Sequence, residues 1–365
     1  MNEIEKFKKI AKFELGGVLF LASNWQWFWD ETIERWKKEG LPPEIPSRPR
    51  SYLHEYFNFS RVEVLPIKMG LIPPFEKEVL EEGENYQIII NYDGSKRKVL
   101  KENRTSSMDQ WLEYPVRDRK SWEEYKKRLN PHTPYRFPPW WEEEKKRYQN
   151  RSHPLGIEDV GSFFGWIRNW MGLENLSYML RDDPSLIEEM EEYIEYFILE
   201  ILKKVLKDIK PDFVQFWEDM AFKSGPLVSP DFVRKYMIPH YKKITDFLRS
   251  NGVEIITLDS DGNIWELIPL WLEGGINGVF PNEVAAGMDI VEMRKKFGKN
   301  LIIIGGIDKR ALAKGRKAIE EEVMKKVPYL LSQGGYFPAI DHSIPPDVPF
   351  ENYLYYLELL RKIGG

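Results

Sequence analysis

Phe213-Val214-Gln215-Phe216-Trp217 runs directly into Glu218-Asp219, and this step from apolar to acidic residues decides the fold. The same step occurs four more times, within residues 255–261, 279–283, 301–308 and 336–342. A helical stretch follows each step. Strands that are apolar throughout and alternate with helices are typical of a parallel sheet buried on both faces. The pattern therefore predicts an α/β fold, either a barrel or a doubly wound sheet.

In either fold the carboxyl ends of the parallel strands open on one side, where such enzymes place their chemistry. We therefore expect the acidic residues to border one cavity. These residues are Glu218, Asp219, Asp259, Asp261, Glu283, Asp308 and Asp341. Like charges a few ångströms apart raise one another's pKa, so this set needs a bound cation, shared protons or basic partners. Basic candidates along the same segments are Lys223, Arg310 and His342.

Three of these positions are a reasonable ligand set for a divalent metal, because carboxylate oxygens and one imidazole suit zinc, manganese or ferrous iron. They are Asp259, Asp261 and His342. The competing interpretation is structural, since an Asp after a strand often caps the next helix, and Asp261 and Asp308 both lie where helices should begin. The Asp-Ser-Asp sequence at 259–261 offers two acids where a cap needs only one. His342 follows Asp341, which can fix its tautomer.

Glu218 and Asp219 are adjacent, so a regular strand would point them to opposite faces. We expect Asp219 to face the pocket, provided that the chain turns there. Downstream, Ser229-Pro230 predicts a helix with Ser229 as its N-cap. His240, in the middle of the helix that follows, is expected to be structural.

The composition limits the class of protein. The chain has 365 residues, 42% of them hydrophobic, which is enough for one domain over 1–365 with an elaborated part over about 1–150. A net charge of −5, with Lys and Arg spread among Glu, argues against nucleic-acid binding. The sequence has no membrane-spanning stretch and no signal peptide, which predicts a cytoplasmic protein. With no cysteine, the chain has no disulfide, thiolate nucleophile or cysteine-ligated zinc.

The N-terminal part predicts further elements. Residues 18–22 should form a first strand, and a Trp-rich helix should run from about Asp30 to Lys38. The runs 86–90 and 97–100 flank Asp93-Gly94-Ser95, which predicts a β-hairpin inserted beside the barrel mouth or at an interface. Asp183-Pro184 should begin a long amphipathic helix, with Asp183 as its N-cap.

Several motifs together resemble the uroporphyrinogen decarboxylase superfamily. They are Trp217-Glu218-Asp219-Met220-Ala221, Leu227-Val228-Ser229-Pro230, Asp259-Ser260-Asp261-Gly262-Asn263, Pro281-Asn282-Glu283, Gly305-Gly306-Ile307-Asp308 and Asp341-His342-Ser343-Ile344-Pro345. The resemblance is good over about 150–365 and loose before that. It implies a (β/α)8 (TIM) barrel, here with an N-terminal elaboration and the β-hairpin insertion.

The superfamily has two main activities, and this chain departs from the motifs of both. Decarboxylases bind the carboxylates of uroporphyrinogen through a Met-Arg-Gln-Ala-Gly-Arg segment, but the matching residues 21–27 contain no arginine. An octa-anionic substrate would meet acids instead. Corrinoid methyltransferases bind zinc through His-x-Cys-Gly and a later Cys. Residues 259–262 align with the first motif and His342 falls near the second, so oxygen and nitrogen would replace the thiolates.

The resemblance therefore implies an enzyme that carries out metal-assisted methyl transfer on a small oxygenated substrate, with a corrinoid held by a partner protein. Asp219, Glu283 and Asp341 are the expected proton-transfer residues, and Glu218, Asp308 and Lys223 are expected in the substrate pocket. The alternatives are a decarboxylase or related lyase, and a barrel that binds a small molecule without catalysis. A homodimer is compatible with the sequence.

Overall fold

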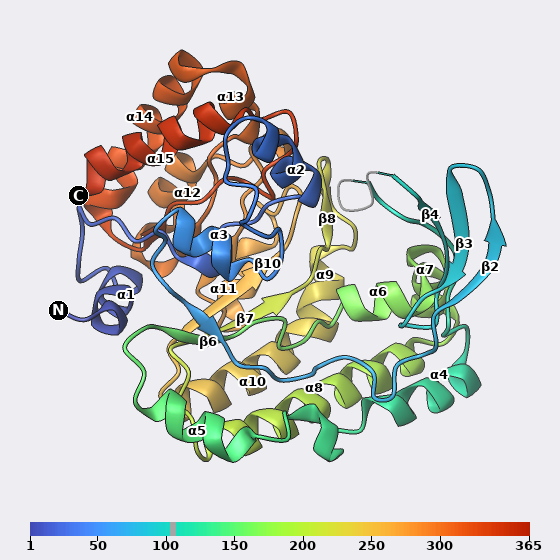
Figure 1. Cartoon of the computed structure of the whole chain (residues 1–365). Coiled ribbons are helices and arrows are strands. Elements are labelled where there is room, and N and C mark those ends of the chain that lie inside the picture. Colours follow the sequence, from blue (N-terminus) through green and yellow to red (C-terminus); the bar gives the residue numbers. More distant parts are fainter. Residues whose placement is uncertain (103–106) are drawn as a thin grey trace.

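A computed structural model describes residues 1–102 and 107–365 and has a curved, seven-stranded parallel sheet at its centre (Figure 1). In spatial order the strands are β1 (Glu63–Val64), β6 (Leu155–Ile157), β7 (Phe213–Trp217), β10 (Ile255–Asp259), β11 (Gly278–Phe280), β12 (Ile302–Ile304) and β13 (Tyr336–Phe337). Every neighbouring pair is parallel. The five strands expected from the apolar-to-acidic steps are all present, in sequence order.

The predicted first strand closes the barrel as an extended segment. Ala22 forms a parallel bridge with Ser60, just before β1. On the other side, the amide nitrogen Nε2 of Gln26 donates to the carbonyl oxygen of Pro338, just after β13, at 3.0 Å. The Phe20 ring also lies 6.0 Å from that of Phe337 in β13, so the segment of residues 20–26 runs between the first and last strands of the sheet, although it forms a β-bridge and not a full strand. The (β/α)8 barrel expected from the resemblance is confirmed.

Helices surround the sheet and follow its strands (Figure 1). They are α1 (Glu3–Ala11), α2 (Asp30–Lys38), α3 (Ser51–Tyr56), α4 (Arg119–Lys126), α5 (Trp141–Gln149), α6 (Gly165–Met171), α7 (Leu173–Asp182), α8 (Pro184–Leu206), α9 (Pro230–Phe232), α10 (Ile238–Ser250), α11 (Ile268–Glu273), α12 (Ile290–Phe297), α13 (Lys309–Lys314), α14 (Arg316–Gln333) and α15 (Phe350–Gly364). In the described ranges, no helix is long and apolar enough to cross a bilayer.

The caps that the sequence predicted are present. The side chain of Asp183 accepts a hydrogen bond from Leu186 N at the start of α8, and Pro184 takes the first helical position. Ser229 caps α9 in the same way, accepting from Phe232 N. The predicted helix over 30–38 coincides with α2. Local capping chemistry therefore fixes where these helices begin.

The inserted hairpin is part of a larger antiparallel sheet. It contains β2 (Glu78–Glu82), β3 (Tyr86–Ile90), β4 (Lys96–Leu100) and β5 (Gln110–Glu113). The turn between β3 and β4 has Gly94 at φ +83°, a conformation that glycine adopts without strain. The sheet projects from the barrel on the side away from both termini (Figure 1). The hairpin prediction is confirmed, and the sequence signal missed only the two outer strands.

An aromatic plug fills the barrel from its amino-terminal end. Phe7 of α1 packs on Phe337 of β13, with ring centroids 5.0 Å apart, and Trp25 packs on Phe213 of β7 at 5.6 Å. Above them, Trp25 Nε1 donates to Gln215 Oε1 at 2.9 Å. The lower and middle barrel is therefore solid. Above this packed interior, at the carboxyl ends of the strands, the acidic residues begin.

Candidate metal centre

Side chains along β7 and β10 point alternately into and out of the barrel, and this alternation determines which acids face its interior. Phe213 and Ile255 belong to the interior cluster, whereas Val214 and Ile256 pack outward against the helices. Since side chains alternate along a strand, Asp259 at the end of β10 points into the barrel mouth. Asp259 is only 4% exposed. The described part of the chain provides no hydrogen-bond donor to its side chain.

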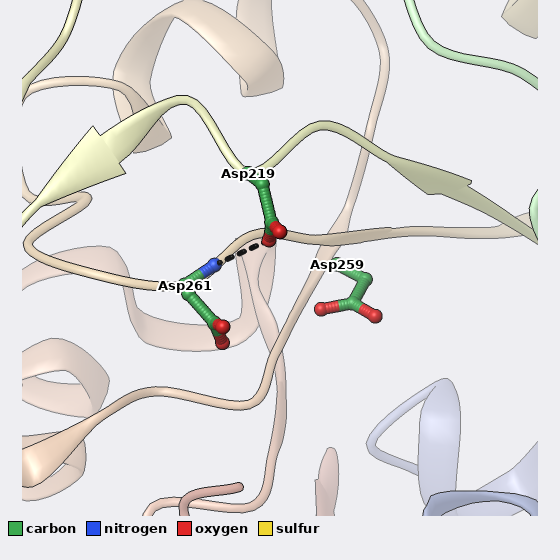
Figure 2. A group of neighbouring side chains, drawn as sticks. All are labelled: Asp219, Asp259 and Asp261. Atoms are coloured by element: carbon green, nitrogen blue, oxygen red, sulfur yellow. Dashed lines mark hydrogen bonds between the residues drawn. The ribbon is translucent and has the colours of Figure 1, made fainter. Parts of the chain in front are cut away.

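Asp219 reaches the same space because the chain turns after β7. Its φ of +47° is in the left-handed region, which Asp tolerates better than most residues. Figure 2 shows its carboxylate beside Asp261, whose backbone nitrogen donates to Asp219 Oδ1 at 3.3 Å. One oxygen from each of Asp219, Asp259 and Asp261 lies within 4.8 Å of the other two. We call these three residues the aspartate triad.

Burial and mutual repulsion both disfavour the ionised form of the triad carboxylates. Burial, reinforced by the charges of Asp261 and Asp219, raises the pKa of Asp259 well above its ordinary value. Burial and the charge of Asp261 raise the pKa of Asp219 to about 6. Arg168 lies close, but its guanidinium donates to the backbone oxygen of Asp219 and not to the carboxylate.

Two further acids at the mouth were missed in the sequence. Glu158 and Asp159 directly follow β6, and their charges contribute to the raised pKa of Asp259. Burial raises the pKa of Glu158 to about 7, although Asn24 Nδ2 donates to its Oε1 at 2.7 Å. The signal was available, because Leu155-Gly156-Ile157 followed by Glu158-Asp159 is a shorter copy of the apolar-to-acidic step.

His342 stands at the edge of the triad. Its Nε2 lies 3.4 Å from Asp261 Oδ2. Burial acts to lower the pKa of His342, but the hydrogen bond and charge of Asp261 outweigh it, so the pKa is raised overall. The predicted ligand set is thus brought together in part: Asp259 and Asp261 share the triad with Asp219, and His342 contacts the triad through Asp261.

Glu283 and Asp341 lie beside the triad and tie the loops of the mouth together. Glu283 Oε2 accepts from Gly262 N at 3.0 Å, and its Oε1 lies 3.4 Å from Lys309 Nζ. Asp341 is fully buried and accepts from the backbone nitrogens of Val284 and Lys309, at 2.9 and 3.0 Å. Their expected part in proton transfer stays a prediction.

The other predicted pocket residues lie apart from the triad. Asp308 caps α13 and forms an ion pair with Arg310 at 2.8 Å, which is the structural use considered for it. Lys223 is exposed in the turn between the short strands β8 (Ala221–Phe222) and β9 (Gly225–Pro226).

Glu218 faces outward from β7 and is fully buried against the helices. It accepts hydrogen bonds from the Ser162 hydroxyl at 2.7 Å, from the Tyr241 hydroxyl, and from three backbone nitrogens. Those three belong to Phe163, Phe164 and Gly165, at 2.8, 2.8 and 3.0 Å. Glu218 thereby holds the amino terminus of α6 against the sheet.

The triad has the properties of a hard-cation site. It offers three carboxylate oxygens close enough to share one ion, and burial together with the neighbouring carboxylate charges raises the pKa values of Asp219 and Asp259. Oxygen donors suit manganese, magnesium or zinc, and a divalent ion would remove the repulsion. The donor set therefore fits a divalent cation on its chemistry.

Comparisons with known proteins agree with this fold. The family model described as uroporphyrinogen decarboxylase (URO-D) matches residues 164–363. A uroporphyrinogen decarboxylase from Hordeum vulgare is 25% identical over 153 residues, covering 41% of this chain and 43% of the relative. One from Geobacter sulfurreducens is 21% identical over 209 residues, covering 57% and 56%. The chain thus spans about half the length of these curated relatives.

Among solved structures, a methyltransferase from Methanosarcina mazei superposes with a TM-score of 0.60 over 99% of both chains, at 15% identity. At that identity the likeness establishes the fold alone.

The electrostatics of Asp219 predict a pH-dependent stability. Its carboxyl pKa is about 6 in the folded protein against 3.8 ordinarily, so its contribution to stability is fully present below pH 3.8 and lost as the pH rises through 6. Asp219→Asn is neutral at every pH and tolerates the left-handed backbone. In chelator at about pH 7.5 we expect the free energy of unfolding of this variant to exceed that of wild type by roughly 1–2 kcal/mol. The difference should vanish near pH 4.

Denaturation by urea between these pH values measures the effect. Asp308→Asn is the matched control, because we expect it to change the free energy of unfolding in the opposite direction. Burial acts to raise the pKa of Asp308, but hydrogen bonds and the charge of Arg310 lower it overall, so its removal should destabilise at neutral pH. An Asp219→Asn protein less stable than wild type at about pH 7.5 would show that the triad is not electrostatically strained.

Proposed function

The chain belongs to the uroporphyrinogen decarboxylase (URO-D) family, and we propose that it is a member that binds a divalent cation, zinc or manganese, at Asp219, Asp259 and Asp261. We further propose that it transfers a methyl group between a small oxygenated substrate and a corrinoid protein. The observation that carries the proposal is the convergence of three carboxylates, two of them with raised pKa values, at the carboxyl-terminal end of the barrel strands.

A bound cation would act as a Lewis acid on an oxygen of the substrate, which weakens the bond from that oxygen to a methyl carbon. The three aspartates would hold the cation and fix the position of the substrate oxygen. His342, in contact with Asp261, either completes the ligand set or orients Asp261 by hydrogen bonding. The aromatic plug keeps bulk water from approaching the site from below.

Proton transfer at the mouth has two suitable groups. A general acid or base works best with a pKa near the working pH. Glu158, with a pKa of about 7, meets that condition and is held by Asn24 at the rim. Asp219, at about 6, meets it when no cation is bound. Glu283 and Asp341, engaged by backbone nitrogens and Lys309, are better suited to holding the loops in place.

Decarboxylation is the second candidate, and the names of the curated relatives favour it. Electrostatics argue against uroporphyrinogen as the substrate. Around the triad the mouth presents Glu158 and Asp159 as well, and this group of acids would repel the carboxylates of an octa-anion placed there. One protein that shares the fold is named a methyltransferase, which agrees with the first proposal. A barrel that binds a small molecule without turning it over would satisfy neither activity test.

The cation site predicts stoichiometric metal binding. Calorimetric titration of chelator-treated, full-length protein with manganese or zinc should give one ion per chain. Asp259→Asn, which removes a ligand charge while keeping the side-chain shape, should weaken binding at least tenfold, on the order of 1.4 kcal/mol. Asp308→Asn, on the same rim but paired with Arg310, should bind as wild type.

His342→Gln separates the two roles of the imidazole. If His342 is a direct ligand, His342→Gln should weaken metal binding about as much as Asp259→Asn does. If His342 only donates a hydrogen bond to Asp261, the loss of affinity should be smaller. Absence of metal binding by wild type, or equal binding by Asp259→Asn, would contradict the proposed site.

The chemistry is tested by two parallel assays on the metal-loaded protein. With methoxylated small molecules and cob(I)alamin, we expect methylcob(III)alamin to form, followed by its absorption spectrum, and we expect Asp259→Asn to abolish it. With uroporphyrinogen we expect no coproporphyrinogen. Efficient decarboxylation by metal-free protein would instead establish the second candidate. Retained methyl transfer in Asp259→Asn would remove the cation from the mechanism.

A further inference from the structure

A separate cavity of about 400 Å³ adjoins the aspartate triad at His342. Its lining consists of Trp27, Trp29, Arg48, Arg50, His342 and Ser343. Trp27 and Trp29 precede α2, and the two arginines lie on the loop between α2 and α3. All four belong to the N-terminal elaboration, outside the part of the chain that the family model matches. This volume is within the range of small-molecule sites.

Two arginines bring positive charge to the lining of this cavity. Arg48 lies 3.3 Å from Asp30 and Arg50 lies 3.9 Å from the same carboxylate, so two guanidinium groups share one acid. Nη1 of Arg50 is shielded from solvent, and no acceptor among the described residues contacts it. The arginines therefore keep net positive charge after pairing with Asp30, and this charge favours binding of a carboxylate.

Aromatic rings form the other main part of the lining. The ring of Trp29 lies 5.6 Å from that of His342, and the ring of Trp27 lies 6.5 Å from it in an edge-on arrangement. Trp27 is itself fixed, with its Nε1 donating to Asn24 O at 2.8 Å and its ring packed on Phe280. Both indoles are partly exposed. Partly exposed indoles beside guanidinium groups favour a planar, anionic ligand.

His342 joins this cavity to the triad. One edge of its ring meets Asp261, and the ring also meets both tryptophans. The two sites are therefore neighbours with opposite charge: carboxylates gather on the triad side and arginines on the cavity side. A molecule that spans them needs an anionic group at one end and a neutral oxygen at the other.

We propose that the cavity binds a planar aromatic carboxylate, with its ring against Trp29 and Trp27 and its carboxylate on Arg48 and Arg50. An oxygen substituent on the far side of the ring is then directed past His342 toward the triad. This names the substrate class of the methyl-transfer site and so rests on the proposed function. The site itself is independent of the cation, because neither the arginines nor the indoles belong to the triad.

Calorimetric titration of the full-length protein with 4-methoxybenzoate, with and without manganese, tests the proposal. We expect saturable binding in both conditions. The neutral analogue 4-methoxybenzamide and the non-aromatic trans-4-methoxycyclohexanecarboxylate should each bind at least tenfold more weakly. Arg50→Gln and Trp29→Leu should each reduce the affinity for 4-methoxybenzoate by tenfold or more. Arg61→Gln, an exposed arginine outside this cavity, should leave it unchanged.

Arg48→Gln provides a second test of the charge should Arg50→Gln fail to fold, since Arg48 is exposed and its loss is tolerable. The inference is overturned if 4-methoxybenzamide binds as tightly as 4-methoxybenzoate, or if either arginine variant keeps the wild-type affinity. It is also overturned if the wild-type protein does not bind 4-methoxybenzoate. Binding of the acid in chelator without any manganese binding would uphold this site while refuting the cation proposal. Manganese binding without acid binding would do the reverse.

Discussion

Like charges forced together at the carboxyl ends of neighbouring parallel strands are the constraint on which the rest of this molecule depends. The register of β7 against β10 aligns Trp217 with Asp259, so the acids that follow each strand emerge side by side. The aromatic plug below them prevents the carboxylates from relaxing into the barrel, and burial limits screening by water. The protein therefore carries a cluster of buried carboxylates that Arg168 and His342 only partly balance, a cost to stability that is typical of functional sites.

The two adjacent acids after β7 point in opposite directions, and this difference determines which of them is available at the mouth. Glu218 turns outward, where hydroxyl and backbone donors satisfy it and it anchors α6. Asp219 turns inward through a left-handed backbone and meets Asp261. Glu283 and Asp341 hold the neighbouring loops through backbone nitrogens. The acids of the rim thus divide into those that the protein satisfies and those that it leaves available, and only the second group suits a ligand.

Much of the fold was predictable because it follows from local rules. Continuous apolar runs, the Asp183 and Ser229 caps and the Asp-Gly turn each specify one element with little help from tertiary context. The site was harder, because it depends on where side chains point after a strand ends. Asp219 was expected to face the pocket if the chain turned after β7, but the sequence did not specify the positive φ that makes this turn, nor that His342 would contact the triad through Asp261. Arg48 and Arg50 lie on a proline-rich loop whose path the sequence does not specify, so the positive side of the mouth was not anticipated.

If the aspartate triad holds a cation, the position of that ion can be observed directly. A crystal grown with manganese, measured at the manganese absorption edge, would locate the ion by anomalous scattering. The account predicts one strong peak at coordination distance, about 2.0–2.3 Å, from oxygens of Asp219, Asp259 and Asp261. A map with no peak among these three residues, or with the ion bound elsewhere while the triad stays bare, would contradict it.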